Sequence, residues 1–187
     1  MSVQSAAPNT LELPQMNLRQ DSAQVPPQIT CDGSDLDWSQ AVVIEGAQPQ
    51  EGELQGWIAF YGLRVNHEPG NILHWQGRPL RASRLRFFVK NVAWRYGFSF
   101  STSIRSPLGK GIPTPPEWRY PGLCRYGLVL FQPNAQLVAH QVWESSPEQP
   151  QEVDLDPNLD IAFNVNDAKG SYGDNSGSFD IYVQVVS

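Results

Sequence analysis

Residues 166–177 are the part of the chain whose residue types could bind a metal ion. They hold the carboxylates of Asp167 and Asp174, the amide of Asn175, several hydroxyl groups, and glycines that leave backbone carbonyls free to turn inward. Calcium takes about 6 to 8 such oxygen ligands, and two converging carboxylates would repel each other without a cation. The pattern is not an EF-hand, because Lys169 stands where the third-position ligand would be. It therefore predicts an irregular Ca²⁺ site or, alternatively, a turn whose polar side chains cap their own backbone.

Two segments with alternating apolar residues enclose this loop, at residues 159–165 and 179–185. A period of two is typical of half-buried strands. We therefore expect the loop to join two strands of one sandwich as a hairpin-like pair and to be displayed at the end of that sandwich. Such a loop on a rigid base is a common place for a binding site.

The composition favours an all-β protein. The 187 residues include 15 Gly and 16 Pro, which divide the chain into short segments, and 8 Phe, 6 Tyr and 6 Trp, which suffice for the core of one β-sandwich domain. Other runs read as strands, at residues 41–44, 56–65, 84–92, 94–100, 123–132 and 136–143.

The domain organisation follows from where the periodicity begins. Residues 1–30 lack sustained apolar periodicity, so we expect a flexible N-terminal tail. Residues 31–187 would form the sandwich domain, in which residues 31–83 add strands to a sheet edge. Residues 101–122 are rich in Pro and Gly and long enough to be a functional loop.

Charge and hydropathy exclude several classes of partner. Residues 84–126 hold eight Lys or Arg against Glu117 alone, but the arginines alternate along strands and the whole chain carries a net charge of −6. This pattern predicts no nucleic-acid partner. No apolar run approaches the roughly 18 residues of a membrane helix, so we expect no membrane span. Without a recognisable signal peptide we expect a cytoplasmic protein, with release or surface association by another route left open.

No arrangement of residues suggests catalysis. The histidines and cysteines are scattered, at Cys31, His67, His74, Cys124 and His140. They form no Cys/His pair, no zinc pattern and no Ser/His/Asp order, so we assign no catalytic residue and expect a protein that is not an enzyme. Residues 31–38 contain a second acidic turn, between Asp32 and Asp37, and so a second possible cation site. We interpret it as ordinary turn chemistry because Asp, Gly and Ser are common turn formers.

The loop resembles the C-terminal calcium loop of the galactophilic lectin family of Pseudomonas. The shared frame is Asn-Asp-x-x-Gly-x-Tyr-Gly-x-Asn-Ser-Gly-Ser-Phe over residues 166–179, and the resemblance spans about residues 84–187. It implies a jelly-roll-like, galactose-binding-like sandwich and one bound Ca²⁺. The ligands that it implies are the side chains of Asp167, Asp174 and Asn175 and the backbone carbonyls of Ser171 and Tyr96. Tyr96 enters because residues 89–97 are similar to the family segment whose tyrosine carbonyl binds calcium.

In that family the calcium binds two neighbouring hydroxyls of a galactoside. The resemblance thus implies a calcium-dependent lectin-like module for galactosides or other glycans, with Asp167 and Asp174 accepting hydrogen bonds from the sugar. Two features differ from the family: Asp174 replaces the usual amide, and residues 117–122 lack the histidine and glutamine that touch the sugar. The alternative is a structural or docking subunit of a larger multi-protein assembly that keeps the fold without sugar binding. Homo-oligomers are compatible with either function.

Trp118 occupies the place of the missing histidine. Its indole could cover the apolar face of a galactose ring and so replace the lost hydrogen bonds by buried area. The alternative is that Trp118 only pins its own loop, since it is flanked by Pro115, Pro116 and Pro121.

Overall fold

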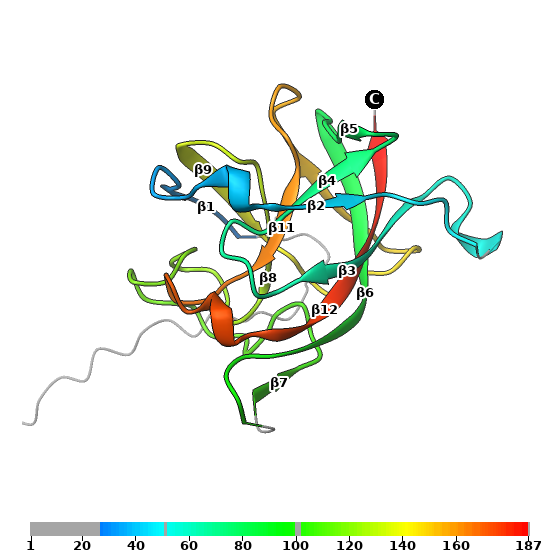
Figure 1. The fold of residues 1–187 in the computed structure, drawn as a ribbon. Coiled ribbons are helices and arrows are strands. Elements are labelled where there is room, and N and C mark those ends of the chain that lie inside the picture. The colour runs from blue at the N-terminus through cyan, green and yellow to red at the C-terminus, as the bar shows by residue number, and fades with distance from the viewer. Residues whose placement is uncertain (1–26, 51, 100–101, 187) are drawn as a thin grey trace, which may run out of the picture.

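The computed structural model describes residues 27–50, 52–99 and 102–186, and it shows an all-β protein. Two sheets pack against each other (Figure 1), which confirms the predicted sandwich. The short helices η1 (Trp38–Gln40), η2 (Gly52–Leu54) and η4 (Tyr172–Asp174) lie between strands. Within the described ranges, no helix combines the length and apolar character needed to cross a membrane.

One sheet has seven strands in the described part of the chain. Its path is β1 (Gln28–Asp32), β9 (Gln136–Gln141), β8 (Leu128–Phe131), β11 (Ala162–Val165), β4 (Asn71–Trp75) and β2 (Val42–Glu45), with β5 (Arg78–Pro79) paired to β4. Neighbours are antiparallel except for β2 and β4, which are parallel.

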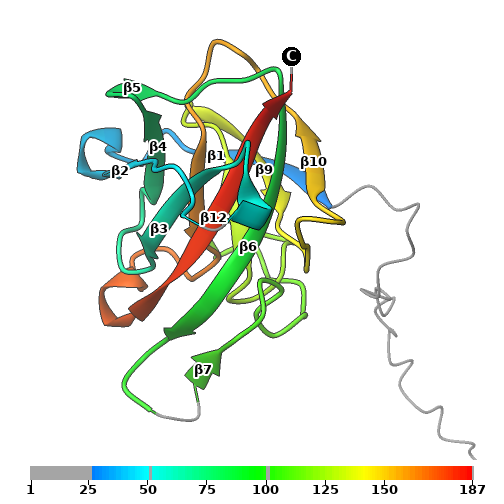
Figure 2. The ribbon, with the colours of Figure 1, turned by 90° about the vertical axis from the view of Figure 1, so that its right-hand side faces the viewer.

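The other sheet is built around two long strands. Its path is β10 (Gln151–Asp154), β6 (Arg84–Arg95), β12 (Ser176–Val186) and β3 (Ile58–Arg64), with β7 (Ser103–Ile104) paired to β6. Figure 2 shows β6 and β12 side by side along the length of the sheet, in antiparallel register. The end of β6 at Arg95 and the start of β12 at Ser176 pair at the end of the sandwich where the 166–177 loop lies.

Apolar side chains fill the space between the sheets and also cover their outer faces. Phe87 of β6 meets Phe163 of β11 across the central core, with ring centroids 5.4 Å apart and an edge-on geometry. A second cluster, around Tyr120 and Phe131, lies under the 115–124 loop on the outer face of the seven-stranded sheet. Strands β8 and β11 are consequently buried on both faces, which holds the start of the 166–177 loop rigidly.

The strands on either side of the 166–177 loop lie in different sheets, so the expected hairpin-like pairing is wrong. β11 pairs with β8 and β4, whereas β12 pairs with β6 and β3. Both strands turn alternate residues, such as Phe163 and Ile181, into the same core. Because apolar alternation reports only that a strand faces a core, it does not reveal which neighbour the strand takes. The loop crosses from one sheet to the other at the end of the sandwich opposite to the C-terminus (Figure 1).

Three other predictions about the strands differ from the structure. Residues 84–92 and 94–100 do not make two strands: β6 is continuous and ends at Arg95, and Phe98 beyond it is 94% exposed. β1 begins at Gln28, within the segment expected to be a tail, and pairs with β9; residues 1–26 lie outside the described residues. Residues 31–83 supply the edge strands β2 and β3 as expected, but also the interior strand β4.

Candidate functional site

Asn166 anchors the beginning of the 166–177 loop. Its side chain is fully buried; Oδ1 accepts a hydrogen bond from the Tyr120 amide at 3.1 Å, and Nδ2 donates to the Tyr120 carbonyl at 2.9 Å. A buried amide that pairs with both polar groups of one backbone residue fixes the two segments relative to each other. This residue lies inside the sequence frame, but its role is to hold the loop and not to bind a ligand.

The Pro-rich 115–120 segment lies directly against the loop. Trp118 and Ala168 form an antiparallel bridge, and the Arg119 amide donates to the Asp167 carbonyl at 2.9 Å. The two segments therefore form one surface, although about 50 residues separate them in the sequence.

Asp167 is a buried carboxylate, only 4% exposed. Its Oδ1 accepts from the Ala168 amide at 2.7 Å, and its Oδ2 accepts from Nδ2 of Asn175 at 3.0 Å. Burial raises the pKa of Asp167; those two hydrogen bonds oppose the rise, and the charges of Asp174 and Glu68 add to it. Among the described residues, no ion pair joins Asp167 to a cationic side chain that would stabilise its ionised form.

Asn175 carries a buried acceptor that no described residue satisfies. The residue is 5% exposed, and its Nδ2 donates both to Asp167 and to the Val65 carbonyl at 3.0 Å. Its Oδ1 is buried without a hydrogen-bond partner among the described residues. Such an atom costs about 1–3 kcal/mol and requires an explanation. A cation beside Asp167 would provide one, because amide and carboxylate oxygens are both calcium ligands.

The remaining predicted ligands, Asp174, Ser171 and Tyr96, lie on segments next to this pair. Asp174 is exposed at the end of η4, and its Oδ2 is 3.7 Å from the point where a Cβ on Gly97 would stand. The β6–β12 ladder ends with Arg95 opposite Ser176, so Tyr96 follows on beside Asn175. Ser171 directly precedes η4. The structure therefore brings Asp167 and Asn175 together and places Asp174 beside the segment that contains Tyr96.

No group of three or more His, Cys, Asp or Glu side chains that could hold a metal is found among the described residues. A cation at this loop would therefore depend on the Asn175 amide and on backbone carbonyls as well as on the two aspartates. That donor set suits calcium, which accepts neutral oxygens, better than metals that prefer nitrogen or sulfur.

Three aromatic side chains, Tyr96, Tyr126 and Trp118, pack against one another beside the loop. The rings of Tyr96 and Tyr126 stack with centroids 3.6 Å apart, and Trp118 meets Tyr126 edge-on at 5.0 Å. Burial raises the pKa of Tyr126 to about 12, with the nearby charge of Asp167 acting in the same direction. Trp118 is only 8% exposed, and the Arg125 guanidinium lies 5.3 Å from its ring. Most of the indole is thus covered by neighbouring side chains such as Tyr126 and Arg125, and a contact between Trp118 and a sugar stays a prediction.

Arg119 is a site residue that the sequence did not indicate. Its guanidinium is 3% exposed and pairs with Asp35 at 2.7 and 3.1 Å and with Glu68 at 3.0 Å. Glu68 also accepts a hydrogen bond from the Gly170 amide at 3.1 Å. Arg119 therefore joins its own segment to two distant ones, which contain Asp35 and Glu68. Its partners Asp35 and Glu68 lie 84 and 51 residues away in the sequence, so no local sequence motif predicts these pairs.

Two of the three aspartates of the second acidic turn, Asp32 and Asp37, accept hydrogen bonds from nearby serines. Oδ1 of Asp32 accepts from the amide and the hydroxyl of Ser34, at 2.9 and 2.7 Å. Oδ1 of Asp37 accepts from the same groups of Ser39, at 3.0 and 2.6 Å. These contacts confirm the interpretation of residues 32–37 as turn chemistry.

Comparisons of the chain with protein-family models, with curated proteins and with solved structures found no match. The likeness to the galactophilic lectin family, over about residues 84–187 and chiefly in the frame of residues 166–179, therefore rests on the sequence and stays a prediction.

Proposed function

We propose that the protein is a calcium-dependent carbohydrate-binding module for galactosides or related glycans. The observation that carries this proposal is the buried, unpartnered Oδ1 of Asn175 beside the buried carboxylate of Asp167. Without a cation, burial is unfavourable both for this amide oxygen and for the ionised carboxylate, and one calcium ion would stabilise both.

The charges around the loop support a cation. Asp174 and Glu68 both raise the pKa of Asp167 through their negative charge. The buried cation nearby, Arg119, is already paired with Asp35 and Glu68. A positive ion at the loop would therefore reduce the repulsion between carboxylates without competing with an existing ion pair.

The chain's own residues would divide the work of binding. Asp167, Asp174, Asn175 and the carbonyls of Ser171 and Tyr96 would hold the ion, which supplies open coordination positions for two neighbouring hydroxyls. The exposed carboxylate of Asp174 can accept a hydrogen bond from one of these hydroxyls. A carboxylate has about four lone-pair sites, so coordination does not exhaust its capacity.

Calorimetric titration of a panel of galactosides, in calcium and in chelator, tests the function. We expect binding in calcium, loss of binding in chelator, and at least a tenfold weaker affinity for Asp174→Ala, which removes an exposed side chain and should fold normally. Asp156→Ala, an exposed aspartate before β11, is the matched control and should bind like the wild type. A glycan array with no calcium-dependent ligand would contradict the proposal and favour the docking subunit.

A further inference from the structure

A pocket lies on the outer face of the five-stranded sheet, where β3, β6 and β12 meet the segment that precedes η2. The cavity measures about 560 Å³. Its lining includes two tyrosines and four polar side chains: Gln48, Gln50, Tyr61, Asn91, Asp180 and Tyr182. A cavity of this size with aromatic rings and a few polar groups is typical of a binding site for a small molecule. We call it the Asp180 pocket.

An irregularity of the sheet sets the position of Asp180. The ladders of β12 with β6 and with β3 both shift register beside this residue, and such bulges re-aim side chains. Oδ1 of Asp180 accepts from the Gly62 amide at 2.7 Å, and Oδ2 accepts from Nδ2 of Asn91 at 2.6 Å. The backbone is left-handed at both partners, with φ +66° at Gly62 and +54° at Asn91. Three neighbouring strands therefore depart from regular geometry where they hold one carboxylate.

Asp180 and Asn91 keep hydrogen-bonding capacity for a ligand. A carboxylate offers about four lone-pair sites, and each oxygen of Asp180 accepts one hydrogen bond from a described residue. The amide of Asn91 donates to Asp180, and an amide group has a second N–H and an acceptor oxygen as well. Because both side chains line the cavity, they present donors and acceptors side by side.

The tyrosines supply an apolar surface next to these polar groups. Tyr61 is 47% exposed, and its ring meets Tyr182 edge-on with centroids 6.0 Å apart. Tyr182 in turn stacks on Phe88 with centroids 4.8 Å apart, so the ring against which Tyr61 packs is itself held in place. An exposed and supported ring beside a carboxylate can pack against the C–H groups of a ligand whose hydroxyls bind the carboxylate.

The charges around the pocket favour a neutral ligand. Asp180 would repel an anion. A cation would be attracted to the aromatic faces, but the Lys90 ammonium already lies 5.4 Å from the ring centroid of Tyr182 and 5.9 Å from that of Phe88. The ligand that fits these groups is a neutral molecule with an apolar face and neighbouring hydroxyls, which is the chemistry of a sugar ring.

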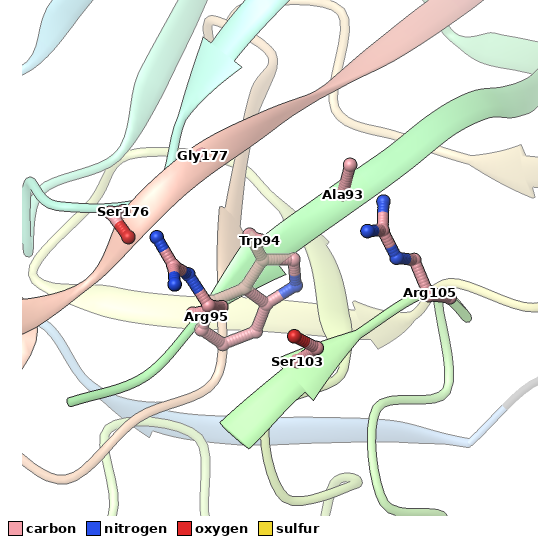
Figure 3. A pocket seen from close by; sticks show the side chains of 7 residues that line it. All are labelled: Ala93, Trp94, Arg95, Ser103, Arg105, Ser176 and Gly177. Atoms are coloured by element: carbon pink, nitrogen blue, oxygen red, sulfur yellow. The ribbon is translucent and has the colours of Figure 1, made fainter. Parts of the chain in front are cut away.

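Another hollow beside the same sheet lacks such an arrangement. It lies where β6, β7 and β12 meet, and Figure 3 shows the indole of Trp94 between the guanidinium groups of Arg95 and Arg105. The two charges of that hollow stand on either side of a ring. The polar groups of the Asp180 pocket, by contrast, are joined to one another by hydrogen bonds.

We propose that the Asp180 pocket binds a neutral saccharide without a metal ion. Tyr61 packs against the sugar ring, Asp180 accepts a hydrogen bond from one hydroxyl, and Asn91 bonds to the neighbouring hydroxyl. The pocket is separate from the 166–177 loop, because Asp180 pairs with Lys90 whereas the β6–β12 ladder reaches the loop only at Ser176. The proposal therefore does not rest on the proposed calcium site.

The experiment is an NMR titration of the full chain in chelator, with lactose, cellobiose and maltose as probes at millimolar concentrations. We expect at least one of these sugars to shift the amide resonances of residues 61–62, 90–91 and 180–182 in a saturable manner. No saturable shift at these residues with any of the three sugars would overturn the proposal.

Two variants test whether the sugar binds in the pocket. Tyr61→Ala removes an exposed ring, so we expect at least tenfold weaker binding and an unfolding temperature close to that of the wild type. Phe98→Ala, which removes a 94% exposed ring elsewhere, is the matched control and should bind like the wild type. Asp180→Asn keeps the size of the side chain but removes its charge, and should weaken binding several-fold. Wild-type affinity in Tyr61→Ala, or an equal loss in Phe98→Ala, would overturn the assignment.

Tetramethylammonium chloride tests the charge of the ligand in the same titration. We expect it to leave residues 61–62, 90–91 and 180–182 unshifted. Saturable shifts with this cation and none with the sugars would mean that the pocket takes cations, and would overturn the assignment of a neutral saccharide. Because every measurement is made in chelator, a failure of the calcium-dependent function leaves these results unaffected, and the reverse also holds.

Discussion

The 32–37 turn and the 166–177 loop have the same kinds of residues but opposite environments. Both are rich in Asp, Gly and Ser. In the first turn, Asp32 and Asp37 are exposed and accept hydrogen bonds from serines two residues further on. In the loop, Asp167 is buried, and its neighbour Asn175 has a buried acceptor to which no described residue donates. Composition therefore identifies an acidic turn, whereas burial and an unsatisfied acceptor identify a candidate ion site.

The aspartate pKa values of the two regions shift in opposite directions, because hydrogen bonds dominate in the turn and burial dominates at Asp167. Hydrogen bonds from Ser34 lower the pKa of Asp32, and those from Ser39 lower the pKa of Asp37. Burial raises the pKa of Asp167. Without a cation, the fold therefore stabilises the ionised carboxylates of Asp32 and Asp37 but destabilises that of Asp167.

One residue connects the two regions. Arg119 binds Asp35 of the turn and Glu68, and Glu68 in turn accepts from the Gly170 amide of the loop. The turn therefore supports the loop: it supplies one of the carboxylates that hold the buried guanidinium in place.

The largest expected effect comes from removing this connection. Arg119→Met keeps most of the side-chain volume but removes the charge, and we expect the free energy of unfolding to fall by about 3 kcal/mol. That value is the lower end of the range for a broken buried ion pair, because Asp35 and Glu68 retain partial exposure. Chemical denaturation measures the change.

Arg81→Met is the matched control for Arg119→Met. Arg81 pairs with Asp160 at 2.7 Å on an exposed surface, where an ion pair contributes less than about 1 kcal/mol. Equal losses in the two variants would mean that Arg119 does not link the two regions.

The same comparison shows what the sequence could and could not predict. Alternating apolar residues before and after the loop indicated strands, and they formed as β11 and β12. The sheet to which each strand belongs depends on contacts that alternation does not encode. The frame of residues 166–179 located the loop, but Arg119 and its partners were missed because their pairing joins segments 51 and 84 residues apart. Local patterns predict elements and turns, whereas the environment of Asp167 depends on distant residues.

Calcium binding should change the free energy of unfolding by slightly less than Arg119→Met does, and the change should depend on the loop and not on the turn. At a concentration about 100 times its dissociation constant, a ligand that binds only the native state adds about 2.7 kcal/mol to the free energy of unfolding. We expect this increment in the wild type and in Asp32→Ala, and its loss in Asp167→Ala. Because each protein is compared with itself in chelator, any change in its baseline stability cancels. A wild-type unfolding temperature that does not respond to chelator would show that the loop, like residues 32–37, is only a turn.

The smallest expected effect is a difference in pH dependence, measured without metal in the presence of chelator. The folded-state pKa of Asp167 is raised above 3.8, so its contribution to stability is present below pH 3.8 and is lost as the pH rises through the folded value. The pKa of Asp35 is lowered, chiefly by its hydrogen bond from Arg119. Its contribution is therefore present above pH 3.8 and is lost as the pH falls through the folded value. Relative to the wild type, Asp167→Asn should gain stability as the pH rises above 3.8, whereas Asp35→Asn should lose stability as the pH rises toward 3.8 from below. Unfolding curves at several pH values give both slopes. Slopes of the same sign would mean that the two carboxylates share one kind of environment, and the contrast between the turn and the loop would not hold.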